Sequence, residues 1–144
     1  MTETSTTPRA LGHPGYSETM SRTPQTAEKA RALVRVALHV WQLDDIEDSA
    51  KLLLSELVAN AVKHARGASV RVIVDRPRVD CVYLAVVDLA PHRLPQLREA
   101  GPDHINGRGL PLIECLSDRW GYDLMGRGQR PWGKRVWAEM KVTR

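Results

Sequence analysis

The chain has 144 residues, of which 42% are hydrophobic and 26% are charged, a composition typical of one globular domain rather than of a disordered segment. Its two cysteines are too few for a disulfide framework or a four-cysteine zinc site. The formal net charge of +4 leaves nucleic-acid binding open, but the 21 Lys and Arg residues are scattered and form no basic arm.

The sequence also gives no sign of a membrane or of export. No apolar run approaches the roughly 18 residues that a membrane-spanning helix needs. Residues 1–15 are polar and lack the apolar segment of a signal peptide. We therefore expect a cytoplasmic protein without a membrane partner.

The first half of the chain predicts a tail followed by two helices. Residues 1–20 are rich in Thr, Ser, Pro and Gly, so we expect a flexible N-terminal tail, with at most an edge strand near its end, and one domain over residues 21–144. Helical spacing of the apolar residues predicts a helix over 27–41. A second predicted helix, over 46–65, is apolar on more than one face and should be mostly buried.

The second half predicts four strands and one helix. Val70, Val72 and Val74 occupy alternate positions of a strand, and the apolar run over 81–87 indicates a central strand. Residues 89–106 show no period and predict a long, functional loop. A helix over 110–119, closed by Trp120-Gly121, and a hairpin of 122–124 with 134–142 complete the order. Adjacent strands with helices on one face predict an α+β layered fold.

The second predicted helix carries a polar stripe. Glu56, Asn60 and His64 are four residues apart and so share one side of the helix, although most of their neighbours are apolar. One interpretation is a polar edge beside the apolar face. The other is a metal and water site, because an Asn oxygen suits Mg²⁺ and a carboxylate one turn away can orient or deprotonate a nucleophile. Spacing alone does not decide between them.

Two further features accompany this stripe. Asp88 ends the apolar run of the central strand, where it could accept a hydrogen bond from an amino group such as that of adenine, or simply cap a turn. Gly107-Arg108-Gly109-Leu110 precedes the third predicted helix, where backbone N–H groups can approach phosphate oxygens. A short Gly-x-Gly is common, and neither a Walker P-loop nor a Rossmann motif is present.

Taken together, the three features resemble, in their order and spacing, the motifs of the GHKL (Bergerat-fold) ATPase superfamily. Ser-Glu-Leu-Val-Ala-Asn-Ala-Val-Lys-His-Ala (55–65) resembles the N box, Val-Asp (87–88) the start of the G1 box, and Gly-Arg-Gly-Leu-Pro-Leu-Ile (107–113) the G2 box. Ser-Asp-Arg-Trp-Gly (117–121) and Gly-Lys-Arg-Val-Trp (133–137) are similar to segments of its stand-alone anti-sigma-factor serine kinases. The resemblance covers about residues 25–142 and implies a two-layer α/β sandwich with a mixed, mostly antiparallel sheet.

The resemblance also implies ATP and Mg²⁺ as cofactors and a role for each site residue. Asn60 would bind Mg²⁺, Glu56 would be the general base, and Asp88 would accept a hydrogen bond from the adenine amine, with residues 89–106 as the ATP lid. The remaining expected nucleotide-binding residues are His64, Ala90, Gly107, Arg108, Gly109, Leu110 and Arg135.

The implied function is that of an anti-sigma factor that is also a serine-protein kinase. Its partners would be a sigma factor and an anti-sigma antagonist, its working form a homodimer, and nucleic acid would not be bound directly. The family's G1 box has glycines where this chain has Ala90 and His92, and its C-terminal strand often has a Thr at the position that Arg135 takes here. These departures favour an alternative, a non-catalytic protein-binding regulator with a degenerate nucleotide site.

Overall fold

The computed structural model describes residues 3–7, 13–64, 67–91, 109–126 and 130–143, and the side chains of residues 3–7 and 109–111 are outside the description. These ranges form a six-stranded sheet, three α-helices and one short 3₁₀ helix. In chain order the elements are β1 Glu3–Thr7, β2 Gly15–Ser21, α1 Thr26–Val40, η1 Asp44–Ile46, α2 Glu47–His64, β3 Ser69–Arg78, β4 Cys81–Asp88, α3 Gly109–Leu116, β5 Arg119–Met125 and β6 Gly133–Lys141.

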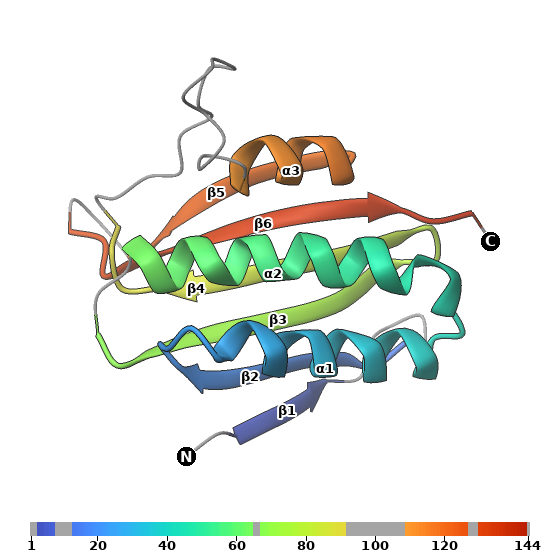
Figure 1. Ribbon diagram of the computed structural model, residues 1–144, viewed down its shortest axis with the longest axis horizontal. Coiled ribbons are helices and arrows are strands. Elements are labelled where there is room, and N and C mark those ends of the chain that lie inside the picture. Colours follow the sequence, from blue (N-terminus) through green and yellow to red (C-terminus); the bar gives the residue numbers. More distant parts are fainter. Residues whose placement is uncertain (1–2, 8–12, 65–66, 92–108, 127–129, 144) are drawn as a thin grey trace.

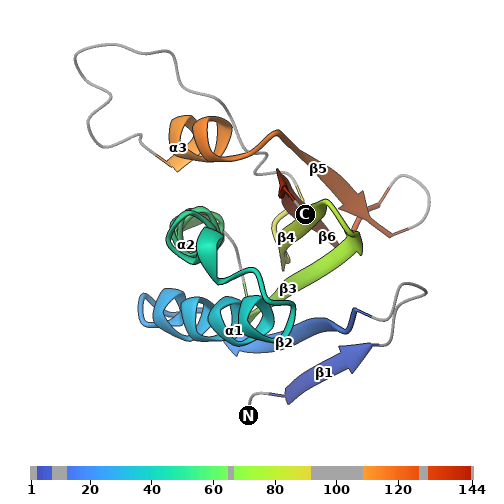
Figure 2. The same ribbon diagram turned by 90° about the vertical axis from the view of Figure 1, so that its right-hand side faces the viewer.

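The sheet and the helices form two layers. The strand order is β1-β2-β3-β4-β6-β5, and each neighbouring pair is antiparallel. The helices cover one face of this sheet, with α2 between α1 and α3 (Figures 1 and 2). This arrangement confirms the predicted α+β sandwich, with every described strand pair antiparallel. None of the described helices is long and apolar enough to cross a membrane.

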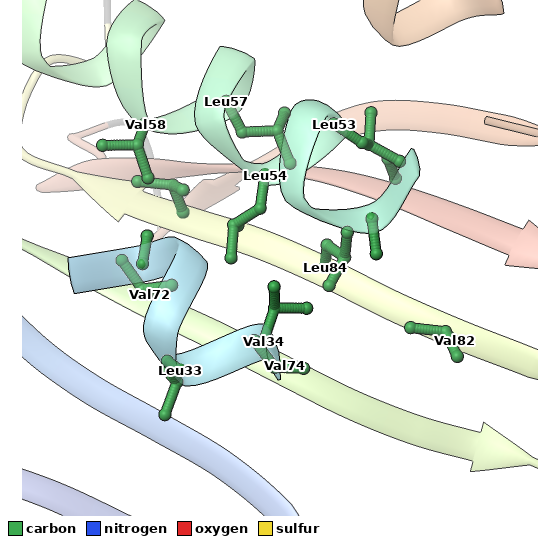
Figure 3. Close-up of a cluster of buried hydrophobic side chains, with 14 of the residues drawn as sticks. Leu33, Val34, Leu53, Leu54, Leu57, Val58, Val72, Val74, Val82 and Leu84 are labelled. Carbon is green, nitrogen blue, oxygen red and sulfur yellow. The ribbon is translucent and has the colours of Figure 1, made fainter. Parts of the chain in front are cut away.

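The core lies between α1, α2 and the inner face of the central strands. On α1 the buried positions follow the helical spacing expected from the sequence, and α2 buries the larger share of its apolar side chains. Figure 3 shows Leu54 and Leu57 of α2 above Leu84 of β4, with Val72 of β3 alongside. Each fully buried Leu of this kind stabilises the fold by about 1.5–3 kcal/mol relative to its exposed state, so this cluster holds α2 against the sheet.

The N-terminal residues contribute strands to the sheet, where the sequence indicated a flexible tail with at most an edge strand near its end. The proposed domain boundary falls inside β2, which pairs with β3 from Tyr16↔Val74 to Ser21↔Ser69, and β1 pairs in turn with β2. The polar sequence of β2 gave only a weak signal for a strand, because only Met20 among its residues is an apolar side chain fully buried in the core. Pairing with a distant strand, rather than local pattern, makes β2 a strand.

The end of the third helix also differs from the prediction. Helix α3 ends at Leu116, and Trp120 and Gly121, expected to close it, lie within β5. Gly121 pairs with Trp137 of β6, and a Cβ at Gly121 would lie 2.9 Å from the Trp137 ring. Gly121 therefore lies in the strand through this pairing, and its lack of a side chain leaves room for the Trp137 ring of the neighbouring strand.

Arg22 joins the end of β2 to the end of α2. Its Nη1 donates to the carbonyl oxygen of Val62 at 2.9 Å, and its Nε donates to that of Gly67 at 2.6 Å. Carbonyl groups in the last turn of a helix lack partners within the helix, and a cation there also suits the helix dipole. Arg22 thereby fixes the C-terminal turn of α2, the turn that ends in His64.

We predict that Arg22→Ala lowers the free energy of unfolding by about 1–2 kcal/mol, because two charge-assisted hydrogen bonds are lost at a partly exposed site. Urea denaturation measures this change. The matched control is Arg35→Ala, since Arg35 is exposed on α1 and its side chain has no hydrogen-bond or ion-pair partner among the described residues. Equal stability of the two variants would contradict the anchoring role of Arg22.

Candidate functional site

The end of β4 carries a buried ion pair. The Asp88 side chain is 2% exposed and the Lys134 side chain 4% exposed, and Lys134 Nζ lies 2.9 Å from Asp88 Oδ1. Lys134 Nζ also donates to the carbonyl oxygen of Ala90 at 2.8 Å, and the Ala90 N–H donates to Asp88 Oδ1 at 2.8 Å. A charged pair this deeply buried is tolerated only with good geometry and further hydrogen bonds, and this one has both.

The strand register brings the two charges together. Strands β4 and β6 pair from Cys81↔Lys141 to Asp88↔Lys134, so the last residue of β4 faces the second residue of β6. Gly133 permits this approach, because a Cβ at that position would collide with the backbone carbonyl oxygen of Asp88. The close backbone contact, rather than an unusual dihedral angle, is what requires a glycine here.

Sequence reasoning assigned Arg135 to this site and did not consider Lys134. In β6 the buried side chains alternate, with Lys134, Val136 and Ala138 toward the helices. Arg135 lies on the other face of the strand, where its Nη2 is 3.7 Å from Asp123 Oδ2 of β5. The alternation was the available signal, since it places Lys134 on the apolar side of β6, where a buried ammonium needs an anionic partner.

Glu56 and Asn60 lie on one flank of α2. On the other flank, Arg31 of α1 donates to Ser55 Oγ at 3.1 Å, which orients that flank toward α1. Successive residues of a helix are about 100° apart, so Glu56 and Asn60 lie on the opposite side of the buried stripe from Ser55. That side is the one nearer α3 (Figure 1). Both side chains are partly buried and neither has a hydrogen bond or ion pair to another described residue. His64, also partly buried, is the last residue of the same helix.

The glycine motif and the predicted lid are mostly outside the described residues. Gly107 and Arg108 lie there, as do all residues of the predicted lid except 89–91. Gly109 and Leu110 form the first turn of α3, which is consistent with the predicted helix start. The N-terminal turn of α3 carries backbone N–H groups that lack partners within the helix.

These pieces converge at one end of the molecule. The last turn of α2, the end of β4 and the start of β6 lie together, on the left in Figure 1, and α3 begins on the same side. A direct contact supports this arrangement, because a Cβ at Gly67, just after α2, would lie 2.8 Å from Leu89 Cδ1, just after β4. The predicted residues Asn60, His64, Asp88 and Ala90 thus come from elements that meet, whereas Arg135 faces away from the helix layer.

Asn60 is the only residue that the sequence predicted to bind a metal ion. No group of three or more His, Cys, Asp or Glu side chains suited to a metal ion occurs in the part of the chain that the structure describes. A single amide oxygen fits Mg²⁺, which is commonly held by one or two protein oxygens together with nucleotide phosphates and water.

The sheet is antiparallel and carries its helices on one face. The middle helix presents an acidic and an amide side chain, and a buried Asp ends a central strand. This combination is typical of a GHKL-type ATPase domain. In agreement, residues 20–138 match the model of the histidine kinase-like ATPase domain, and the chain belongs to this family. No curated protein matches the chain.

The family implies ATP, usually with Mg²⁺, and the described residues fit this ligand pair. Asp88 Oδ2 has no hydrogen-bond partner among the described residues, so it can accept one from a base. The side chains of Glu56 and Asn60 are likewise uncommitted in that part of the chain. Ala90, which stands where the family has a glycine, contributes to the site through its backbone N–H and C=O.

We predict that Gly133→Ala lowers the free energy of unfolding by more than about 2 kcal/mol, because the new methyl group must push β6 away from the Asp88 carbonyl. Thermal or urea denaturation measures the loss. Lys141→Ala is the control within the same strand, since its side chain is exposed and has no partner among the described residues. A Gly133→Ala variant as stable as the control would rule out the tight β4–β6 approach.

Proposed function

We propose that this protein is an ATP-binding anti-sigma factor and serine-protein kinase that regulates transcription by partner switching. The observation that carries the proposal is the placement of Glu56 and Asn60 on one flank of α2. The same histidine kinase-like ATPase domain has Asp88 at the end of β4. The segments at 117–121 and 133–137, which resemble those of stand-alone anti-sigma kinases, support the assignment to this branch.

Each residue has a distinct task in this proposal. Asn60 would hold Mg²⁺ through its side-chain oxygen, Asp88 would accept a hydrogen bond from the adenine amine, and the first turn of α3 would face the phosphates. ATP, when bound, supplies the phosphoryl group. Glu56 would orient the serine hydroxyl of the protein substrate and take up its proton, the usual task of a carboxylate base in such kinases.

Partner switching follows from this activity. The phosphorylated antagonist no longer binds the kinase, which is then free to hold the sigma factor. The proposed working unit is a homodimer, for which the exposed Val36 and Val40 on the outer side of α1 offer apolar surface. Sedimentation of the purified protein as a monomer at micromolar concentrations would remove the dimer from the proposal.

We predict that Mg²⁺-ATP binds the purified protein and that both Asn60→Ala and Asp88→Asn weaken this binding by at least about tenfold, since each removes a group that contacts the ligand. Isothermal titration calorimetry measures the affinities. Arg35→Ala is the control, because Arg35 is exposed on α1. Wild-type protein that is folded but binds no ATP at millimolar concentration would overturn the nucleotide site.

A second prediction addresses the chemistry. Glu56→Gln should lower the rate of phosphoryl transfer to a serine-bearing antagonist by about 10²–10⁴-fold, because the base is lost, while ATP affinity stays within about twofold. The assay uses γ-labelled ATP and purified antagonist proteins from the same organism. Transfer at the wild-type rate in Glu56→Gln would exclude Glu56 as the base.

The alternative is a non-catalytic protein-binding regulator with a degenerate nucleotide site. The observation that favours it is the environment of Asp88, where Ala90 replaces a family glycine and Lys134 occupies one carboxylate oxygen. Under this alternative the folded protein binds an antagonist or a sigma factor equally well with and without ATP. Nucleotide-dependent transfer of phosphate to an antagonist would eliminate it.

A further inference from the structure

The two oxygens of Asp88 have different surroundings. Oδ1 accepts two hydrogen bonds, from the Ala90 N–H at 2.8 Å and from Lys134 Nζ at 2.9 Å. Oδ2 accepts none from the described residues. An ionised carboxylate has acceptor sites on both oxygens, so one half of this group is already used by the protein and the other half is left for a ligand.

Lys134 is itself held in place. Besides Asp88 Oδ1, its ammonium donates to the carbonyl oxygen of Ala90 at 2.8 Å. The three residues close a ring of hydrogen bonds at the start of the turn after β4, and all three are buried. Because the ring fixes Oδ1, rotation of the carboxylate is restricted and Oδ2 keeps one direction.

The ring also balances the charge of the Asp88 carboxylate within the protein. A carboxylate with 2% exposure is costly to bury without a cation, and the Lys134 ammonium lies 2.9 Å from Asp88 Oδ1. Arg135 does not serve, because it lies on the other face of β6 beside Asp123. With the charge balanced internally, the free oxygen suits a neutral N–H donor, such as the exocyclic amine of a purine, rather than a second cation.

We propose, on the basis of the nucleotide site proposed above, that Lys134 is a positioning residue that sets the base selectivity of this site. By holding Asp88 Oδ1, it presents Oδ2 to the 6-amino group of adenine. Inosine triphosphate is the probe, because it carries a carbonyl oxygen instead of that amine, together with an N–H at ring position N1 where adenine has an acceptor. A carbonyl oxygen facing Oδ2 finds no donor there and binds less well.

The test is calorimetric titration of the full chain with Mg²⁺-ATP and with Mg²⁺-inosine triphosphate. Wild-type protein should prefer ATP by at least about tenfold, since a site built around a hydrogen bond rejects a ligand that cannot make it. In Lys134→Met the ATP affinity should fall by about tenfold while the inosine triphosphate affinity changes by less than about twofold. A merely structural role would lower both affinities together.

Two further variants complete the design. In an Asp88→Asn background, Lys134→Met should change the ATP affinity by less than about twofold, because the carboxylate that Lys134 positions is absent. Lys134→Gln keeps an N–H donor near Asp88, and it carries the comparison if Lys134→Met does not fold, with a smaller loss confined to ATP. Circular dichroism checks the fold of each variant.

The outcomes separate the two proposals. ATP binding by the wild type with unchanged selectivity in the Lys134 variants overturns the role of Lys134 and leaves the nucleotide site in place. A gain of ATP affinity in Lys134→Met means that the ammonium competes with the base, and this also overturns it. A folded wild-type protein that binds neither nucleotide overturns the nucleotide site, and the role of Lys134 falls with it.

Discussion

The buried pair of Asp88 and Lys134 is the constraint on which the candidate site depends. At 2.9 Å the two charges attract each other by about 6 kcal/mol if the effective dielectric constant is about 20. Removing each ion from water costs several kcal/mol, so attraction and desolvation nearly cancel. The net stabilisation is therefore small, but removal of either partner destabilises the fold, because the other would remain buried and unpaired. The pair thus favours one arrangement of β4, β6 and the turn at Ala90.

This constraint reaches the rest of the fold through strand register. Asp88 faces Lys134 because β4 and β6 keep one register from Cys81↔Lys141 to Asp88↔Lys134, and apolar side chains of both strands belong to the core on which α2 packs. Helix α2 is in turn fixed at its C-terminal turn by Arg22, which follows β2. The polar flank of α2 and the acidic end of β4 are therefore positioned by one continuous set of contacts.

Much of this fold could be predicted from local pattern. The spacing of Leu33, Val34 and Ala37 predicted α1, and the apolar run from Cys81 predicted β4, because both elements bury a regular subset of side chains. Strand β2 was indicated only as an edge strand, since its sequence is polar and its partner β3 lies some fifty residues further along the chain. Likewise, Gly121 lies in a strand because it pairs with Trp137 of β6, a contact that no local pattern contains.

The candidate site shows the same division between local and non-local information. Asp88, Glu56 and Asn60 could be found because each stands out against apolar neighbours in its own element. The partner of Asp88 depends on the register between strands that are separated by α3 and β5, and a shift of one residue would exchange Lys134 for Arg135. The same register brings Lys134 to the backbone of Ala90 and so shows what Ala90 contributes to the site. Its contacts with Asp88 and Lys134 are made by backbone groups, which alanine supplies as glycine does, so the missing glycine is compatible with an ordered carboxylate at the end of β4.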